Sequence, residues 1–233
     1  MSLEYQAGND PASAGPLANL LKIQVEDYYR GLRVRSPFLQ RASQGTVSPY
    51  MVAIYVSNLR FLFAQTPEFL KKSIERAHQA RLPELATFYQ EKWREEQGHD
   101  KWAEDDLVHI SEMFGVKGEL ALSCHVKNLV KYLFETIEQD PLLFLSYIFF
   151  AEYLTILAGP ELLYLLETKC GIPKRMVSAI GNHAELDKDH VDEMIREINN
   201  LVDADGYSGK FLEVVEKASS FHEAFCEEVG KTH

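Results

Sequence analysis

Apolar residues recur at helical spacing along almost the whole chain, and no run alternates between apolar and polar residues at the period of a strand. Glycine and proline separate the helical stretches, and proline stands near the start of several of them. The pattern predicts helices at residues 17–30, 47–65, 67–80, 83–114, 119–138, 141–168, 173–200 and 208–229. We therefore expect an all-α protein, a single compact bundle of seven to eight helices.

The predicted bundle forms one domain, residues 17–233, because no internal repeat and no long linker divides it. A chain of 233 residues with 46% apolar residues is large enough to bury a single core. Residues 1–16 contain neither the basic region nor the apolar stretch of a signal peptide. We expect them to be a disordered lead-in and the protein to be cytoplasmic.

Residues 141–159 are almost entirely apolar and contain one charged residue, Glu152. Their length is borderline for a membrane span, but the acid near the middle and the lack of a Lys/Arg bias in the flanks favour a central bundle helix. Glu152 is then a carboxylate in the core. Such a group needs an ion-pair partner, a bound proton, hydrogen bonds or a metal ion.

Charge and cysteine content exclude several classes of function. The chain has 24 Lys and Arg against 35 Asp and Glu, a net charge of −11, which argues against nucleic-acid or anionic-membrane partners. The acidic residues at 104–106 are expected to form a solvated face. Cys124, Cys170 and Cys226 are widely spaced and form no CxxC pair, which argues against a cysteine zinc site or a disulfide framework.

The predicted helix at 173–200 carries three potential metal ligands on one face. His183, Asp187 and His190 follow at i, i+4 and i+7, within a stripe about 60° wide at roughly 100° per residue. Two imidazoles beside a carboxylate suit iron, manganese or zinc. The helix also carries further charged residues, so a solvated polar face is the alternative when this helix is considered alone.

The predicted helix at 83–114 offers an E-x-x-H pair at i and i+3, a device of dinuclear metal bundles. Glu95 and Glu91 are the alternatives for its carboxylate. Three helices together then supply three imidazoles and three carboxylates: Glu96, His99, Glu152, His183, Asp187 and His190. The set contains no thiolate, which favours non-haem iron with manganese as the main competitor. A metal-free polar network of the same residues is the other interpretation.

Three segments resemble the haem-oxygenase-like superfamily, which includes TenA/THI-4 proteins and PQQ-synthesis protein C: EEQGHDKW at 95–102, DPLLFLSYIFFAEY at 140–153 and HAELDKDH at 183–190. The H-x-x-x-D-x-x-H element is most similar to that of the diiron oxidases and oxygenases in this superfamily. The resemblance covers residues 17–230 and implies a bundle of about seven helices that is often dimeric.

The resemblance also implies ligand positions, which match His99, Glu152, His183, Asp187 and His190. Some members carry the remaining carboxylate seven residues before the first histidine, where this chain has Lys92. Lysine cannot serve as a carboxylate ligand. Glu96 is therefore our choice on geometric grounds, with Glu95 and Glu91 behind it.

The function implied by the resemblance is that of a non-haem diiron oxidase or oxygenase, with labile iron, that activates O2 to oxidise a small organic substrate. Expected partners are this substrate, O2 and a second copy in a homodimer, without nucleic acid or membrane. One alternative is a metal-free enzyme resembling TenA or PQQ-synthesis protein C, and another is a small-molecule-binding or regulatory module. The TenA branch uses a cysteine nucleophile, and the surroundings of Cys124 do not resemble its motif.

Overall fold

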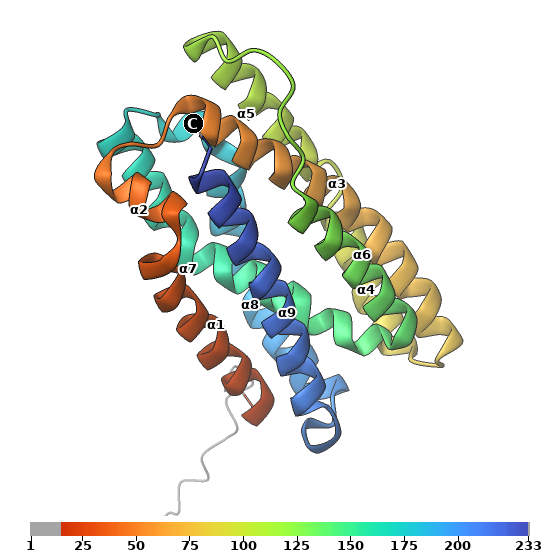
Figure 1. The fold of residues 1–233 in the computed structure, drawn as a ribbon. Coiled ribbons are helices and arrows are strands. Elements are labelled where there is room, and N and C mark those ends of the chain that lie inside the picture. Colours follow the sequence, from red (N-terminus) through yellow and green to blue (C-terminus); the bar gives the residue numbers. More distant parts are fainter. Residues whose placement is uncertain (1–14, 233) are drawn as a thin grey trace, which may run out of the picture.

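The computed structural model describes residues 15–232, which form helices and no strand, so the predicted all-α class is confirmed (Figure 1). Residues 1–14 of the predicted lead-in and residue 233 lie outside the described residues. The α-helices are α1 (Pro16–Arg35), α2 (Pro37–Gln44), α3 (Pro49–Gln79), α4 (Pro83–Glu95), α5 (His99–Phe114), α6 (Cys124–Gln139), α7 (Phe144–Cys170), α8 (Ser178–Leu201) and α9 (Ala204–Gly230). Two 3-10 turns, η1 (Pro141–Leu143) and η2 (Lys174–Val177), precede α7 and α8.

The helices pack as two groups, one around α3 and one around α7, which crosses the molecule (Figure 1). Helix α3 packs against α4, α5 and α6, whereas α7 packs against α1, α2, α8 and α9. Contacts between α5 and α8 and between α6 and α9 join the two groups. The segments singled out by the sequence lie on α4, α5, α7 and α8, so both groups contribute to the candidate site.

The predicted break at Pro67 is wrong, because α3 continues through this residue as a single helix. Proline removes one helical hydrogen bond and costs about 3 kcal/mol inside a helix. Helix α3 packs along its length against α4, α5 and α6, and this packing outweighs the local cost. A local helix-breaking residue ends a helix only where tertiary contacts do not favour its continuation.

The predicted single helix at 83–114 is also wrong, since it is divided into α4 and α5. Helix α4 ends at Glu95, and Gly98 adopts the left-handed conformation with φ of 85° before α5 begins at His99. Glycine accepts this conformation without the steric cost that a side chain brings. Glu96 and His99 are therefore brought together by a turn rather than by one helical face.

Two smaller differences from the predicted elements have local causes. Helix α2 was not expected, although Ser36 caps it by accepting a hydrogen bond from the Leu39 amide and Pro37 occupies its first turn. Helix α9 begins at Ala204, four residues before its predicted start, and Asp203 caps it through the Asp205 amide. Both helices are started by short capping signals.

The apolar segment at 141–159 forms the core, as the sequence predicts. Residues Pro141–Cys170 are the one helix of the described chain that is long and apolar enough to cross a membrane, with a mean hydropathy of 1.8 in its most apolar window. Within the bundle 61% of that window is buried, as in the core helix of a soluble protein. Glu152 lies on this helix and is 8% exposed.

Helix α8 lies very close to α7 because Gly159 has no side chain. A Cβ atom at Gly159 would lie 3.2 Å from Ala184 Cβ and 3.4 Å from Ile180 Cγ2. Ala184 directly follows His183, so this close approach sets the distance between the backbone of α7 and the candidate ligands of α8. A larger residue at position 159 would separate the two helices.

Gly159→Val is expected to lower the free energy of unfolding by about 2 kcal/mol, because a β-branched side chain does not fit between α7 and α8. Gly181→Ala is the matched control in α8, where an added Cβ would make an ordinary 3.5 Å contact with Leu163. It should be neutral or stabilise by up to about 1 kcal/mol through helix propensity. Urea unfolding followed by circular dichroism measures both, and equal stability of Gly159→Val and the native chain would contradict the packing argument.

Candidate metal centre

The six residues predicted as metal ligands gather in two groups of three, and within each group the potential ligand atoms lie within 4.8 Å of one another. The first triad is Glu96, His99 and His183, and the second triad is Glu152, Asp187 and His190. The sequence predicted the set of residues. The division into two triads, each combining residues from different helices, is visible only in the structure.

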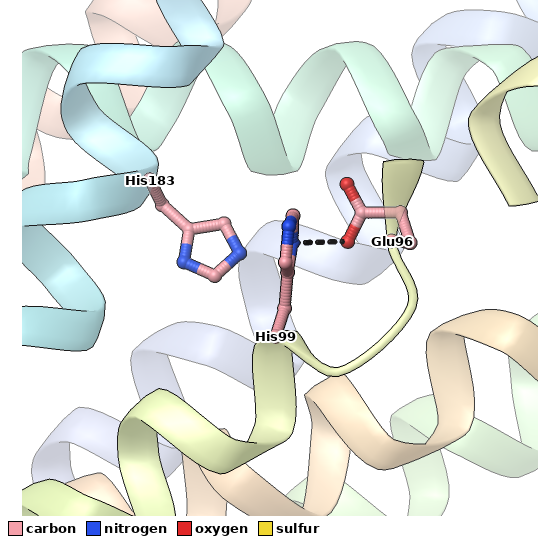
Figure 2. A group of neighbouring side chains, drawn as sticks. All are labelled: Glu96, His99 and His183. Atoms are coloured by element: carbon pink, nitrogen blue, oxygen red, sulfur yellow. Dashed lines mark hydrogen bonds and ion pairs between the residues drawn. The ribbon is translucent and has the colours of Figure 1, made fainter. Parts of the chain in front are cut away.

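Hydrogen bonds orient the side chains of the first triad (Figure 2). His99 Nδ1 lies 3.0 Å from Glu96 Oε2, so the ring N–H donates to this carboxylate. His183 Nδ1 lies 2.8 Å from the carbonyl oxygen of Ala179 and donates to it. This second bond leaves the lone pair of His183 Nε2 for a cation, as is usual for metal-binding histidines.

Aromatic contacts hold the two rings of the first triad in place. His99 stacks on Trp102 with ring centroids 4.2 Å apart, and His183 stacks on Phe63 at 4.4 Å. The rings of His99 and His183 meet edge to face at 5.0 Å, and Figure 2 shows them turned toward each other. Trp102 therefore packs directly against a candidate ligand, and the histidines are preorganised by their neighbours.

The second triad has polar atoms that its protein neighbours do not satisfy. His190 Nδ1 lies 3.6 Å from both Glu152 Oε1 and Asp187 Oδ1, beyond hydrogen-bond distance. Glu152 Oε2 and His190 Nδ1 are buried without a hydrogen-bond partner. Unsatisfied buried groups of this kind call for a bound cation or water. Together the two triads offer only nitrogen and oxygen ligands, which fit divalent iron or manganese.

The buried carboxylates of the site differ in their pKa values. Burial raises the pKa of Glu152 well above its ordinary value, and Asp187 and Glu96 add to this effect against the opposing Lys92 ammonium. Burial also raises the pKa of Asp187, although His190 opposes it. Burial acts in the same direction on Glu96, but the hydrogen bond and charge of His99 outweigh it and lower the pKa. The Lys92 ammonium therefore offsets only part of the cost of burying the Glu152 carboxylate.

Lys92 occupies the helix turn before Glu96 and is 2% exposed. Its Nζ atom lies 2.7 Å from Glu193 Oε2, 3.3 Å from Glu95 Oε2 and 3.7 Å from Glu152 Oε1. Burial lowers the pKa of Lys92, but Glu152 and the other two carboxylates outweigh it and raise the pKa above its ordinary value. Lys92 therefore stays an ammonium ion beside the second triad.

The two alternative carboxylates of α4 are not grouped with His99 and His183. Glu91 is exposed, and Glu95 is 42% exposed at its side chain and pairs with Lys92 and with His190 Nε2 at 3.7 Å. Glu96 is the carboxylate grouped with His99 and His183. Its place at the C-terminal end of α4 depends on the helix break at Gly98.

The expectation that residues 104–106 form a solvated face is wrong for Asp106, which is fully buried. Its Oδ1 accepts hydrogen bonds from the Ser178 amide at 2.9 Å and the Ser178 hydroxyl at 2.6 Å, and its Oδ2 accepts from the Ala179 amide at 2.9 Å. The first amides of a helix have no partner inside it, and an anion there is favoured by the helix dipole. Asp106 thus fastens α5 to the start of α8.

No protein-family model matches the sequence, and no curated protein matches it. Solved structures do resemble it. A domain of unknown function with a heme oxygenase-like fold from Shewanella denitrificans has a TM-score of 0.78 at 16% identity, covering 91% of this chain and 90% of that one. The chain has the haem-oxygenase-like fold.

Two further structures share the haem-oxygenase-like fold with this chain. A CADD-like protein of unknown function from Nostoc punctiforme has a TM-score of 0.68 at 16% identity, covering 91% of this chain and 98% of that one. A TenA homolog from Pseudomonas syringae has a TM-score of 0.68 at 12% identity and 95% coverage of both chains. At these identities the likeness concerns the fold alone, and the chemistry has to be argued from the residues of the site.

Two adjoining cavities open inside the haem-oxygenase-like bundle beside the triads. The smaller one, about 100 Å³, is lined by members of both triads and by Lys92, and we call it the metal-side cavity. The larger one, about 140 Å³, is lined mainly by aliphatic and aromatic side chains, and we call it the apolar cavity. Both cavities are lined by Leu62, Phe63, Tyr147, Ala151, Thr155 and His183.

The apolar cavity contains a thiol and an imidazole that the sequence analysis did not single out. His222 and Cys226 lie at i and i+4 on α9, with Sγ 3.7 Å from Nε2, and His222 Nδ1 lies 2.7 Å from the Tyr28 hydroxyl. Burial raises the pKa of Cys226 to about 12 and lowers that of His222 to about 4. Both groups are neutral at pH 7, so they do not form the thiolate pair of a cysteine hydrolase.

Asp106→Ala is expected to lower the free energy of unfolding by about 3 kcal/mol, because it leaves three donors at the start of α8 without their charged acceptor. Asp105→Ala, one residue earlier and exposed, is the matched control and should change stability by less than about 0.5 kcal/mol. Thermal and urea unfolding measure the difference. Equal effects of the two substitutions would show that Asp106 does not fasten α5 to α8.

Proposed function

We propose that this protein is a non-haem diiron oxidase or oxygenase that uses O2 to oxidise a small organic substrate. The observation that carries the proposal is the convergence of six nitrogen and oxygen side chains, from α4, α5, α7 and α8, in two largely buried triads beside one cavity. Carboxylate and imidazole ligands arranged in helix bundles are typical of dinuclear iron and manganese sites. Iron is the proposed metal, and manganese is its main competitor.

The residues of the chain have distinct parts in this proposal. Glu96, His99 and His183 would hold one ion, and Glu152, Asp187 and His190 the other. Iron, when bound, supplies the O2 chemistry. The protein contributes fixed ligand directions, through Ala179 and the aromatic neighbours, and an apolar cavity that excludes water.

The substrate proposed for this site is a small, predominantly apolar molecule. The apolar cavity of about 140 Å³ adjoins the metal-side cavity, and His183 lines both. A dry cavity of similar volume accommodates a molecule of about the size of benzene. Tyr147 also lines both cavities, and no residue of the described chain hydrogen-bonds its hydroxyl, which suits a single polar group on the substrate.

The remaining parts of the proposal concern the cellular setting. We expect a cytoplasmic homodimer that acts without nucleic acid or membrane, in keeping with the net charge of −11 and the burial of the apolar core helix. A metal-free enzyme or binding module would use the same cavities without iron. Metal binding is therefore the measurement that separates the two classes of function.

Anaerobic titration of the metal-free chain with Fe(II) is expected to bind about two irons per chain at saturation, and mixing with O2 should oxidise them. His183→Ala and Glu152→Ala should each lower the bound iron, because each removes a ligand from one triad. His109→Ala, an exposed histidine on α5, is the matched control and should bind like the native chain. Metal analysis, optical and Mössbauer spectra record the result, and no binding above the background would contradict the oxidase proposal.

Ala151→Phe is expected to abolish binding of a small apolar probe such as benzene while leaving iron content unchanged, because its ring would fill the boundary between the two cavities. Ala151→Ser nearly keeps the size of the side chain and should lower the affinity for the probe by less than about tenfold. Ligand-detected NMR measures the probe. Undiminished binding to Ala151→Phe would remove the apolar cavity from the substrate proposal.

A further inference from the structure

The ammonium group of Lys92 lies next to one triad and not the other. Its Nζ atom pairs with Glu152 of the second triad at 3.7 Å, and no ion pair to Glu96 exists among the described residues. Members of both triads line the metal-side cavity with Lys92, so the ion pair to Glu152 is what distinguishes the second triad. The second triad thus has a built-in positive charge as a neighbour, which the first triad lacks.

The buried Lys92 ammonium repels a divalent ion at the second triad and so lowers the affinity of that triad for it. Glu152 and Asp187 are both buried, and like charges interact more strongly there than in water. A divalent ion bound by Glu152 would share this carboxylate with the Lys92 ammonium. The first triad has no such competitor, and its two histidines are already oriented by neighbouring groups.

Two further carboxylates can pair with the Lys92 ammonium on the side nearer to solvent. Glu193 lies 2.7 Å and Glu95 3.3 Å from Nζ, and their side chains are 27% and 42% exposed. Lys92 can therefore move away from Glu152 while it remains paired. The same three contacts explain how a lysine that is 2% exposed is accommodated beside this site.

We propose that Lys92 makes the two triads unequal, so that the first triad binds a divalent ion tightly and the second binds one only as the ammonium shifts from Glu152 toward Glu193 and Glu95. This inference rests on the proposed metal centre and deepens it. The chain holds one ion at low metal concentration and two at high concentration. Lys92 is a positioning residue that sets the threshold for completing the dinuclear site.

The test is titration of the full-length, metal-free chain with Mn²⁺, a redox-stable probe, with free Mn²⁺ counted by electron paramagnetic resonance. The native chain is expected to show two steps whose dissociation constants differ at least tenfold. His183→Ala should remove the tight step and Asp187→Ala the weak one. Two steps of equal affinity in the native chain would overturn the inference without any variant.

Lys92→Gln and Lys92→Met should lower the dissociation constant of the weak step at least tenfold. The dissociation constant of the tight step should stay within about threefold of the native value. Lys188→Gln is the matched control, since this exposed lysine of α8 pairs with Glu185 alone. Circular dichroism reports whether each variant is folded. An unchanged separation of the two steps in folded Lys92→Gln would overturn the inference.

A double-mutant cycle distinguishes the ammonium from the general negative charge of the site. Glu193→Gln should weaken the second step in the native background, because Lys92 loses its outward partner, and should have less effect in the Lys92→Gln background. An equal effect in both backgrounds would overturn the role assigned to Lys92. Absence of Mn²⁺ binding in every chain would instead remove the metal centre itself. Stepwise binding without oxidation of iron by O2 would retain the inference and reject the oxidase function.

Discussion

Burial of the Glu152 carboxylate is the constraint on which the rest of this site depends. The residue is buried on the apolar central helix of the bundle, and an uncompensated charge there is costly. The Lys92 ammonium compensates this charge in part, yet Glu152 Oε2 still lacks a hydrogen-bond partner. The neighbouring Asp187 carboxylate adds further negative charge beside Glu152 and raises the pKa of Glu152. In the proposed metal centre, this excess of negative charge would favour a bound cation.

The two halves of the site come from two groups of helices. Helices α4 and α5 belong with α3, whereas α7 and α8 pack against each other and against the terminal helices. Asp106 holds the groups together by capping α8 from α5, and Gly159 lets α8 approach α7 closely. The ligand geometry is thus a consequence of contacts outside the ligand set. Such support is what a preorganised metal site requires.

Helical periodicity was sufficient to predict the fold class, the buried central helix and the ligand stripe on α8. These features depend on which residues are apolar and on the 3.6-residue repeat. The two members of the E-x-x-H pair do lie together, but a turn at Gly98 and not a helical face brings them there. Pro67 predicted a helix end that is absent, because long-range packing of α3 outweighs the local helix-breaking effect of proline. Local patterns fail where tertiary energy exceeds local propensity.

The sequence by itself determined the kinds of side chains available, their order and the faces of the helices on which they stand, because those follow from composition and backbone periodicity. Only the tertiary structure decided which candidate ligands share a triad, that Lys92 lies beside Glu152, and that Asp106 is a buried cap. The apolar cavity with His222 and Cys226 was likewise visible only once the helices were packed. Distances between residues far apart in the chain are set by how helices pack, and no local pattern encodes them.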